Sequence, residues 1–220
     1  EGGLIAPMVS RSVPDVDWLV LLAPPGVPGD SLLQLQVARI AAASGADAAT
    51  VERQRARQRA IQDIVKGTDD PEEAAVQIQR AVREGIEGMT PDERRSAGLD
   101  DPVVVDSVVA RSARQVLSPW FRYFLTHDPR PELRALRIPV LVLLGEKDVQ
   151  VPPEENAPAL RSALAESAAD VRDVRVMSGL NHLFQHAETG LPAEYGRIEE
   201  TMAPEALEAI STWILEVVRP

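Results

Sequence analysis

Two side chains that could share a proton, an aspartate and a histidine, each follow a stretch that predicts a buried β-strand. Asp148 comes after "PVLVLLGE" and His182 after "DVRVMSG", with room between them for one helix and one strand. Ligands of open α/β sheets bind beyond the carboxyl ends of the strands, so both side chains are expected at the same edge. A carboxylate fixes the tautomer of a neighbouring imidazole and stabilises the imidazolium that forms when the ring takes a proton. The pair therefore predicts the acid and the base of nucleophilic catalysis.

Each of the two residues also has an ordinary structural explanation. An aspartate after a strand is often only a turn former or helix cap, and a single histidine is more often structural than catalytic. The chain order favours catalysis, because a helix-opening turn, an aspartate and a histidine follow one another at strand ends, as Ser, Asp and His do in one class of hydrolases. The sequence contains no cysteine, so a thiolate nucleophile, a disulfide and a cysteine-bound metal are excluded.

The elements that must position Asp148 and His182 alternate between strand and helix. Short apolar runs closed by Gly or Pro, at 17–24 and 138–148, predict buried parallel strands, and 173–179 predicts a weaker one. Helical patterns follow at 152–169 and 204–218. This alternation predicts an α/β fold with a doubly wound, mostly parallel sheet.

The middle of the sequence carries helix-start signals but no convincing strand. A proline follows each of Asp70, Thr90 and Asp101, as is typical of the first helical position, and Gly85 is expected to end a helix. The block is far too long for a simple crossover connection. We therefore predict a helical cap or lid at residues 29–130, inserted into a core formed by residues 1–28 and 131–220.

With these elements in place, the sequence resembles the α/β-hydrolase superfamily, in particular its esterases and peptidases with a helical cap. The most specific match is the spacing Gly-x-x-Asp-x-x-Val-Pro, followed by Asn-His, at Gly145, Asp148, Val151, Pro152, Asn181 and His182. Further matches are "WLVLLAPPG", the segment "SPWFRYFLTHDPRPELRALRIPVL" and the opening "EGG" with the helix after it. The resemblance implies that Asp148 is the family's acid and His182 its general base.

The resemblance also implies a role for the first residues. In this family the nucleophilic serine stands in Gly-x-Ser-x-Gly, a tight turn between a strand and a helix. Glu1 and Gly2 match the last two positions, so the serine is expected immediately before Glu1, together with earlier strands of the sheet. The backbone N–H of Glu1 is then implied as one oxyanion donor, supported by the positive end of the helix that begins here.

The opening residues allow two further interpretations. In the first interpretation, Glu1-Gly2-Gly3 is a flexible remnant of a tag and has no catalytic role. Another serine could also act as the nucleophile. The candidates are Ser10, Ser12 and Ser31, but none of them stands between the two glycines of a Gly-x-Ser-x-Gly motif.

A catalytic zinc site is the alternative to the Asp-His pair as an explanation of His182. His182 and His186 have the spacing of two ligands on one helical face, and Glu188 or Glu194 could add a third. Leu183 stands where the glutamate of the zinc motif belongs, which argues against zinc. We expect no metal and no cofactor.

The resemblance implies a serine hydrolase that cleaves carboxylic esters through a Ser-His-Asp triad and an acyl-enzyme. Trp120, Phe121 and Phe124 would line the substrate pocket, although packing between cap and sheet explains them equally well. A peptidase or amidase on the same fold is the alternative, and a small ester or a short peptide is the expected substrate. If the chain were complete as printed, a non-catalytic binding module, dimeric through its exposed sheet edge, is the further alternative.

The composition of the chain argues against several classes of binding partner. A net charge of -11 and a pI near 4.8 argue against nucleic acids and anionic membranes, whose binding requires clustered Lys and Arg. Pro and Gly interrupt the longest apolar runs, so none reaches the roughly 20 residues of a membrane span. The lack of cysteine fits a reducing cytoplasm, but export stays open because a leader could precede the printed residues. A homodimer also stays open.

Overall fold

The computed structural model describes residues 1–218, and their contacts form two compact units. The core unit contains Glu1–Asp47 and the chain from Asp128 onward, and the helical unit contains Ala48–His127. The sequence pattern places residues 29–47 in the cap, whereas the structure groups them with the sheet. In this unit, Arg39 of helix α2 (Gly29–Ala43) pairs with Glu155 of α9 (Pro153–Ala165) at 2.8 Å. A role of the helical unit as a cap stays a prediction.

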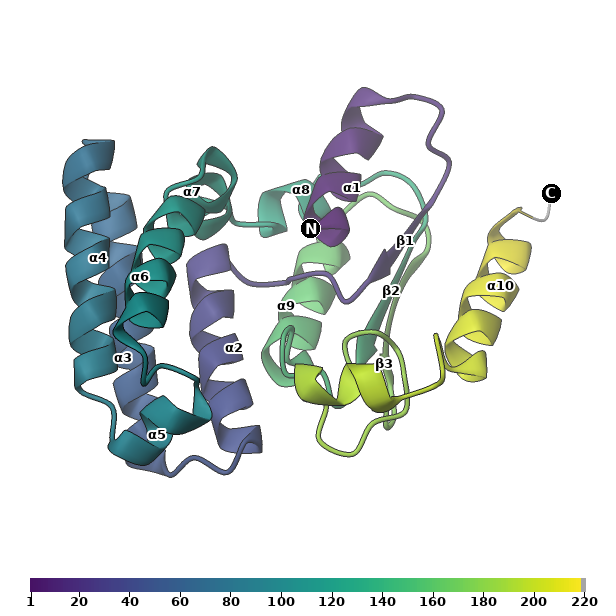
Figure 1. Cartoon of the computed structure of the whole chain (residues 1–220). Coiled ribbons are helices and arrows are strands. Elements are labelled where there is room, and N and C mark those ends of the chain that lie inside the picture. The colour runs from purple at the N-terminus through teal and green to yellow at the C-terminus, as the bar shows by residue number, and fades with distance from the viewer. Residues whose placement is uncertain (219–220) are drawn as a thin grey trace. The chain divides into compact units, whose positions relative to one another are not determined.

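The core unit is built on a parallel sheet in the order β1-β2-β3, which confirms the predicted α/β fold with parallel strands. The strands are β1 (Leu19–Leu22), β2 (Val140–Gly145) and β3 (Arg172–Met177). Helix α9 lies on one side of the sheet and α10 (Pro204–Val218) on the other (Figure 1). Helix α1 (Gly2–Ser12) packs on β1, and the short α8 (Arg130–Arg134) precedes β2.

The central strand β2 is buried along its whole length, because helices cover both of its faces. Leu141 and Leu143 belong to the cluster that contains Trp213 of α10, and Trp18 meets the Trp213 ring edge-on with centroids 6.3 Å apart. Burial on both faces explains why this strand has a continuous apolar sequence rather than an alternating one. Strand β3 lies at an edge of the sheet and is partly exposed, which explains its weaker sequence pattern.

The helical unit contains α3 (Ala48–Gly67), α4 (Pro71–Glu87), α5 (Pro91–Ser96), α6 (Pro102–Val116) and α7 (Pro119–Thr126), and the structure places no strand in residues 48–127. The three predicted helix starts are confirmed, since the side chains of Asp70, Thr90 and Asp101 each accept a hydrogen bond from a backbone N–H of the first turn.

One predicted helix end in this unit is wrong. Gly85 lies inside α4, which continues to Glu87 and is capped by Gly88. A Cβ at residue 85 would lie 3.5 Å from the Arg57 side chain of α3. Packing of α4 on α3 therefore extends the helix past a residue that alone favours a helix end.

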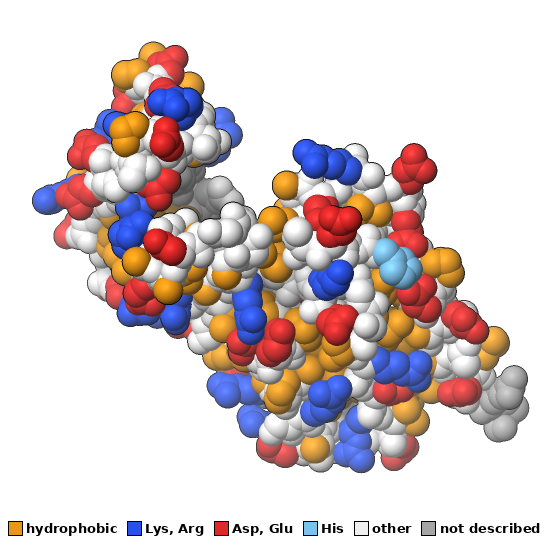
Figure 2. Space-filling view, turned by 90° about the horizontal axis from the view of Figure 1, so that it is seen from below, with side chains coloured by type: hydrophobic (Ala, Val, Ile, Leu, Met, Phe, Trp, Pro, Cys, Tyr) orange, Lys and Arg blue, Asp and Glu red, His pale blue; other side chains and the backbone are white. Residues whose placement is uncertain are grey.

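The surface mixes charges of both signs. Acidic and basic side chains are interspersed over the face shown in Figure 2, with apolar side chains between them. Within residues 1–218, no helix combines the length and the hydrophobicity that crossing a bilayer requires.

Candidate active site

Asp148 lies in the turn that follows β2 and is almost completely buried, with 3% of its surface exposed. One carboxylate oxygen, Oδ1, accepts hydrogen bonds from the backbone N–H groups of Gln150 (2.7 Å) and Val151 (2.9 Å). These two bonds form the turn before α9, as expected of an aspartate at such a position. They also fix the orientation of the carboxylate, so that Oδ2 is presented to a second partner.

That second partner is His182. Its Nδ1 lies 2.8 Å from Asp148 Oδ2, and its side chain is 29% exposed whereas that of Asp148 is fully buried. Because an ionised carboxylate only accepts hydrogen bonds, the neutral ring carries its proton on Nδ1 and keeps the lone pair on Nε2. The structure thus brings together the two residues that the sequence paired, in the geometry that leaves Nε2 able to accept a proton.

Gly145 allows the loop that carries His182 to lie directly over the end of β2. A Cβ at residue 145 would meet the backbone oxygens of Leu180 and Asn181, the latter at 2.5 Å. The Lys147 N–H donates to the Leu180 oxygen at 2.9 Å and holds the loop in this position. The glycine of the Gly-x-x-Asp motif is therefore required by the close approach of the histidine loop.

Replacement of Gly145 by alanine is expected to push this loop away from β2 and to destabilise the protein by about 1–3 kcal/mol, the usual cost of overpacking a filled site. The free energy of unfolding in urea measures this effect. Gly196→Ala is the matched control, because a Cβ at residue 196 meets no atom within 4 Å. Equal stability of the two variants would contradict this account of Gly145.

A pocket of about 380 Å³ adjoins His182. Its wall includes Glu1, Gly2 and Gly3 at the start of α1, together with the end of β1 and the turn after it. Gly3 packs tightly here, since a Cβ at this residue would lie 2.7 Å from the Cβ of Pro24. The start of α1 and His182 therefore face one common space.

The turn after β1 is held in place from α9. The fully buried Asn156 accepts a hydrogen bond from the Gly26 N–H through Oδ1 (2.8 Å) and donates to the Pro152 oxygen through Nδ2 (2.8 Å). One side chain thus ties the pocket wall formed by this turn to the segment that begins at Asp148.

The sequence did not reveal the polar contacts that brace the segment after His182. The Gln150 amide donates to the Tyr195 hydroxyl at 2.9 Å. Burial, together with the nearby charge of Asp148, raises the pKa of Tyr195, although the bond from Gln150 opposes this.

Two further contacts hold the end of the histidine loop and the residues that follow it. The Lys147 ammonium donates to the Ala187 oxygen at 2.6 Å. Burial opposes ionisation of Glu194, but hydrogen bonds from Thr189 and Gly190 outweigh it and lower the Glu194 pKa. No spacing or periodicity connects these residues in the sequence.

The structure does not bring His182 and His186 together as the zinc alternative requires. Residues 181–187 form a loop rather than a helix, so the four-residue interval does not align His182 with His186. The His182 ring meets Asp148, whereas the His186 ring meets Glu200 and Glu205. Over the described part of the chain, no three His, Asp or Glu side chains are grouped as metal ligands would be.

None of the three alternative serines lines the pocket beside His182. The Ser10 hydroxyl donates to the Pro7 oxygen within α1 at 2.9 Å, and the Ser31 hydroxyl donates to Asp30 at 3.2 Å. Ser12 is the last residue of α1, at the end opposite to the one that lines the pocket.

The predicted substrate-binding aromatics lie on α7 of the helical unit. The rings of Trp120 and Phe121 each lie with their centroid 6.3 Å from that of Phe124, so the three form one aromatic cluster. Trp120 is 37% exposed. Their contact with a substrate stays a prediction.

Comparison with known proteins gives structural matches only. No family model matches the sequence, and no curated protein does. A proline iminopeptidase-related protein from Thermus thermophilus is 22% identical with a TM-score of 0.44, over 99% of this chain and 62% of that one. An esterase from a Rhodococcus species is 18% identical with a TM-score of 0.37, over 98% of this chain and 62% of that one. The chain spans 62% of the length of each of these two proteins.

Proposed function

We propose that the chain carries the acid and the base of a serine hydrolase that cleaves carboxylic esters through an acyl-enzyme. The observation that carries the proposal is the 2.8 Å contact between His182 Nδ1 and the buried Asp148 carboxylate, beside a pocket that the start of α1 also lines. An oriented imidazole next to a helix N-terminus combines a general base with a site that stabilises negative charge.

The nucleophile in this proposal is a serine joined directly to Glu1. Glu1 caps α1 and lines the pocket beside His182, and consecutive Cα atoms are about 3.8 Å apart. A serine in that position would stand at the same pocket. The backbone N–H of Glu1 would then donate to the oxyanion, with the positive end of α1 behind it.

Catalysis in this proposal begins when His182 Nε2 takes the proton of the serine hydroxyl and the serine oxygen attacks the ester carbonyl carbon. Asp148 stabilises the imidazolium that results. His182 then gives its proton to the leaving oxygen, which departs as the alcohol, and the acyl-enzyme remains. Water enters, loses a proton to the same Nε2 and attacks the acyl carbon. The bond from this carbon to the serine oxygen then breaks, and His182 returns the proton to that oxygen, which releases the acid and restores both serine and imidazole.

A pair of substrates with the same acyl group tests ester against amide specificity. The full-length protein is expected to hydrolyse a p-nitrophenyl ester with kcat in the usual enzymatic range of about 1–10³ s⁻¹ and to leave the matching p-nitroanilide nearly uncleaved. The Ser10→Ala variant should retain wild-type rates, because that hydroxyl is bonded within α1. Faster cleavage of the anilide would indicate a peptidase or amidase instead, and cleavage of neither substrate would contradict the proposed hydrolase.

A further inference from the structure

The loop that carries His182 has a conformation that needs outside support. It spans residues 179–187 and closes on itself, since the Ala187 N–H donates to the Gly179 oxygen at 3.2 Å and Leu180 pairs with His186 in an antiparallel bridge. Phe184, two residues after His182, has a φ of 59°, which is strained for a bulky residue. Such a conformation persists only where surrounding contacts enforce it.

Buried amides provide the inner part of this support. Asn181 Oδ1 accepts the backbone N–H groups of Leu183 (2.9 Å) and Gln185 (3.0 Å), and its Nδ2 donates to Gln185 Oε1 (3.1 Å). Gln185 Nε2 donates in turn to the Glu200 backbone oxygen at 2.8 Å. The loop is thereby joined from the inside to the segment that leads into α10.

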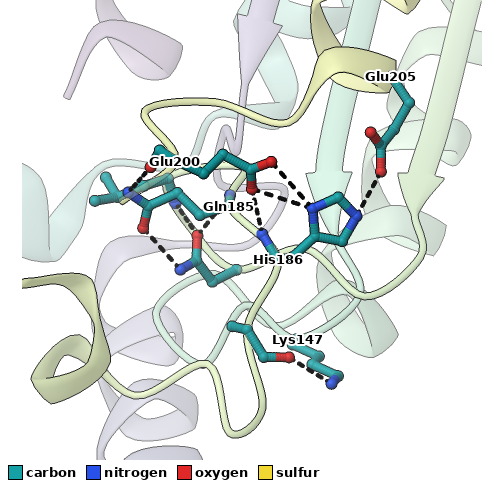
Figure 3. Close-up of polar contacts among 8 residues, drawn as sticks. Lys147, Gln185, His186, Glu200 and Glu205 are labelled. Atoms are coloured by element: carbon teal, nitrogen blue, oxygen red, sulfur yellow. Dashed lines mark hydrogen bonds and ion pairs between the residues drawn. The ribbon is translucent and has the colours of Figure 1, made fainter. Parts of the chain in front are cut away.

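His186 provides the outer part, as Figure 3 shows. Its backbone N–H donates to Glu200 Oε2 at 2.8 Å, its Nδ1 lies 3.1 Å from the same oxygen, and its Nε2 lies 2.9 Å from Glu205 Oε1. Glu205 belongs to the first turn of α10, where a negative charge is stabilised by the helix dipole. One imidazole therefore connects the His182 loop to two separate segments.

Both ring contacts are hydrogen bonds only when His186 carries two N–H protons, because carboxylates accept and do not donate. The hydrogen bond from the His186 backbone, together with that from its ring, lowers the pKa of Glu200 although burial opposes this. Glu200 therefore stays charged beside the ring in neutral solution. The Lys147 ammonium, which donates to the Ala187 oxygen, also holds this loop (Figure 3).

We propose that His186 is a positioning residue, which fastens the His182 loop to Glu200 and to the start of α10 and so keeps His182 in register with Asp148. The proposal rests on the proposed function for its catalytic consequence. The contacts of the His186 ring are partly exposed, with 57% of the His186 side chain and 45% of the Glu205 side chain accessible, so they contribute little to global stability. Their effect is on the geometry of the pair that transfers the proton.

The His186→Ala variant tests the proposal through two readouts. The first is the ¹⁵N resonances of the His182 ring, which report the share of the Nδ1–H form. They should move toward the values of a free imidazole. The second is kcat for a p-nitrophenyl ester in the full-length protein. It should fall about tenfold with KM nearly unchanged, because misplaced catalytic groups lower the rate of the chemical step.

Control variants distinguish an effect on the position of His182 from an effect on the stability of the protein, and from a failure of the proposed ester hydrolysis. His186→Arg supplies several N–H donors to the same two carboxylates and should restore the wild-type resonances and most of kcat. Arg134→Ala breaks a similarly exposed ion pair with Glu166, before β2, and should change neither readout. Unchanged His182 resonances in His186→Ala would overturn the proposal. Shifted resonances in a protein whose wild type hydrolyses no ester would instead overturn the proposed function and leave the positioning role intact.

Discussion

Replacing His182 with asparagine in the full-length protein is expected to lower kcat for ester hydrolysis by about 10⁴–10⁶-fold, as loss of the base does in other triads. The side-chain amide of asparagine can occupy the position of Nδ1 and donate to Asp148 Oδ2, but it offers no group in the place of Nε2. The buried carboxylate therefore keeps a partner while the base is lost. Steady-state kinetics with a p-nitrophenyl ester measures the loss.

The alanine variant separates chemistry from folding. His182→Ala removes the base and also leaves Asp148 Oδ2 buried without its partner, which costs about 1–3 kcal/mol or more for a charged group. Both variants should be inactive, and only His182→Ala should show a clearly lower midpoint in urea. If His182→Asn retained a tenth of the wild-type turnover, His182 would not be the general base.

The Asp148→Asn variant is expected to lower kcat by about 10⁴-fold with little change in structure. Oδ1 must continue to accept the Gln150 and Val151 N–H groups, so the new NH₂ group can only face His182. Nδ1 must then accept a hydrogen bond, and the ring proton moves to Nε2, the nitrogen that has to receive the serine proton. Asparagine has nearly the same shape as aspartate, so we expect the substitution to change the tautomer of His182 rather than the structure.

Kinetics and ring ¹⁵N resonances together test the tautomer argument. Asp148→Asn should show His182 protonated on Nε2, and Asp173→Asn, an aspartate of the same unit paired with Arg175, should behave as wild type. A loss of kcat smaller than tenfold in Asp148→Asn, or an unchanged tautomer, would contradict the role given to Asp148.

The sequence could predict the fold and the central pair because both follow from short-range patterns. A strand buried on both faces must be apolar throughout, which makes β2 recognisable from 138–148. Parallel strands end at a common edge, so residues that follow β2 and β3 must lie near one another. Asp148 and His182 can therefore be paired from the sequence alone.

Features that depend on tertiary contacts were beyond such reasoning. The assignment of α2 to the core unit depends on contacts such as that of Arg39 with Glu155, far away in the chain. Gly85 continues a helix that packs along its length on α3. The spacing of His186 indicates a metal ligand only if the four-residue interval is helical, whereas the path of the loop brings this residue to Glu200 and Glu205.

In the proposed mechanism, His182 and Asp148 serve a serine joined to Glu1. Reaction of the full-length protein with a fluorophosphonate, followed by peptide mass spectrometry, tests it most directly, because such reagents phosphonylate an activated serine. We expect a single adduct, on a serine immediately before Glu1, that does not form in His182→Asn. An adduct on another serine such as Ser10, or labelling that persists in His182→Asn, would contradict it.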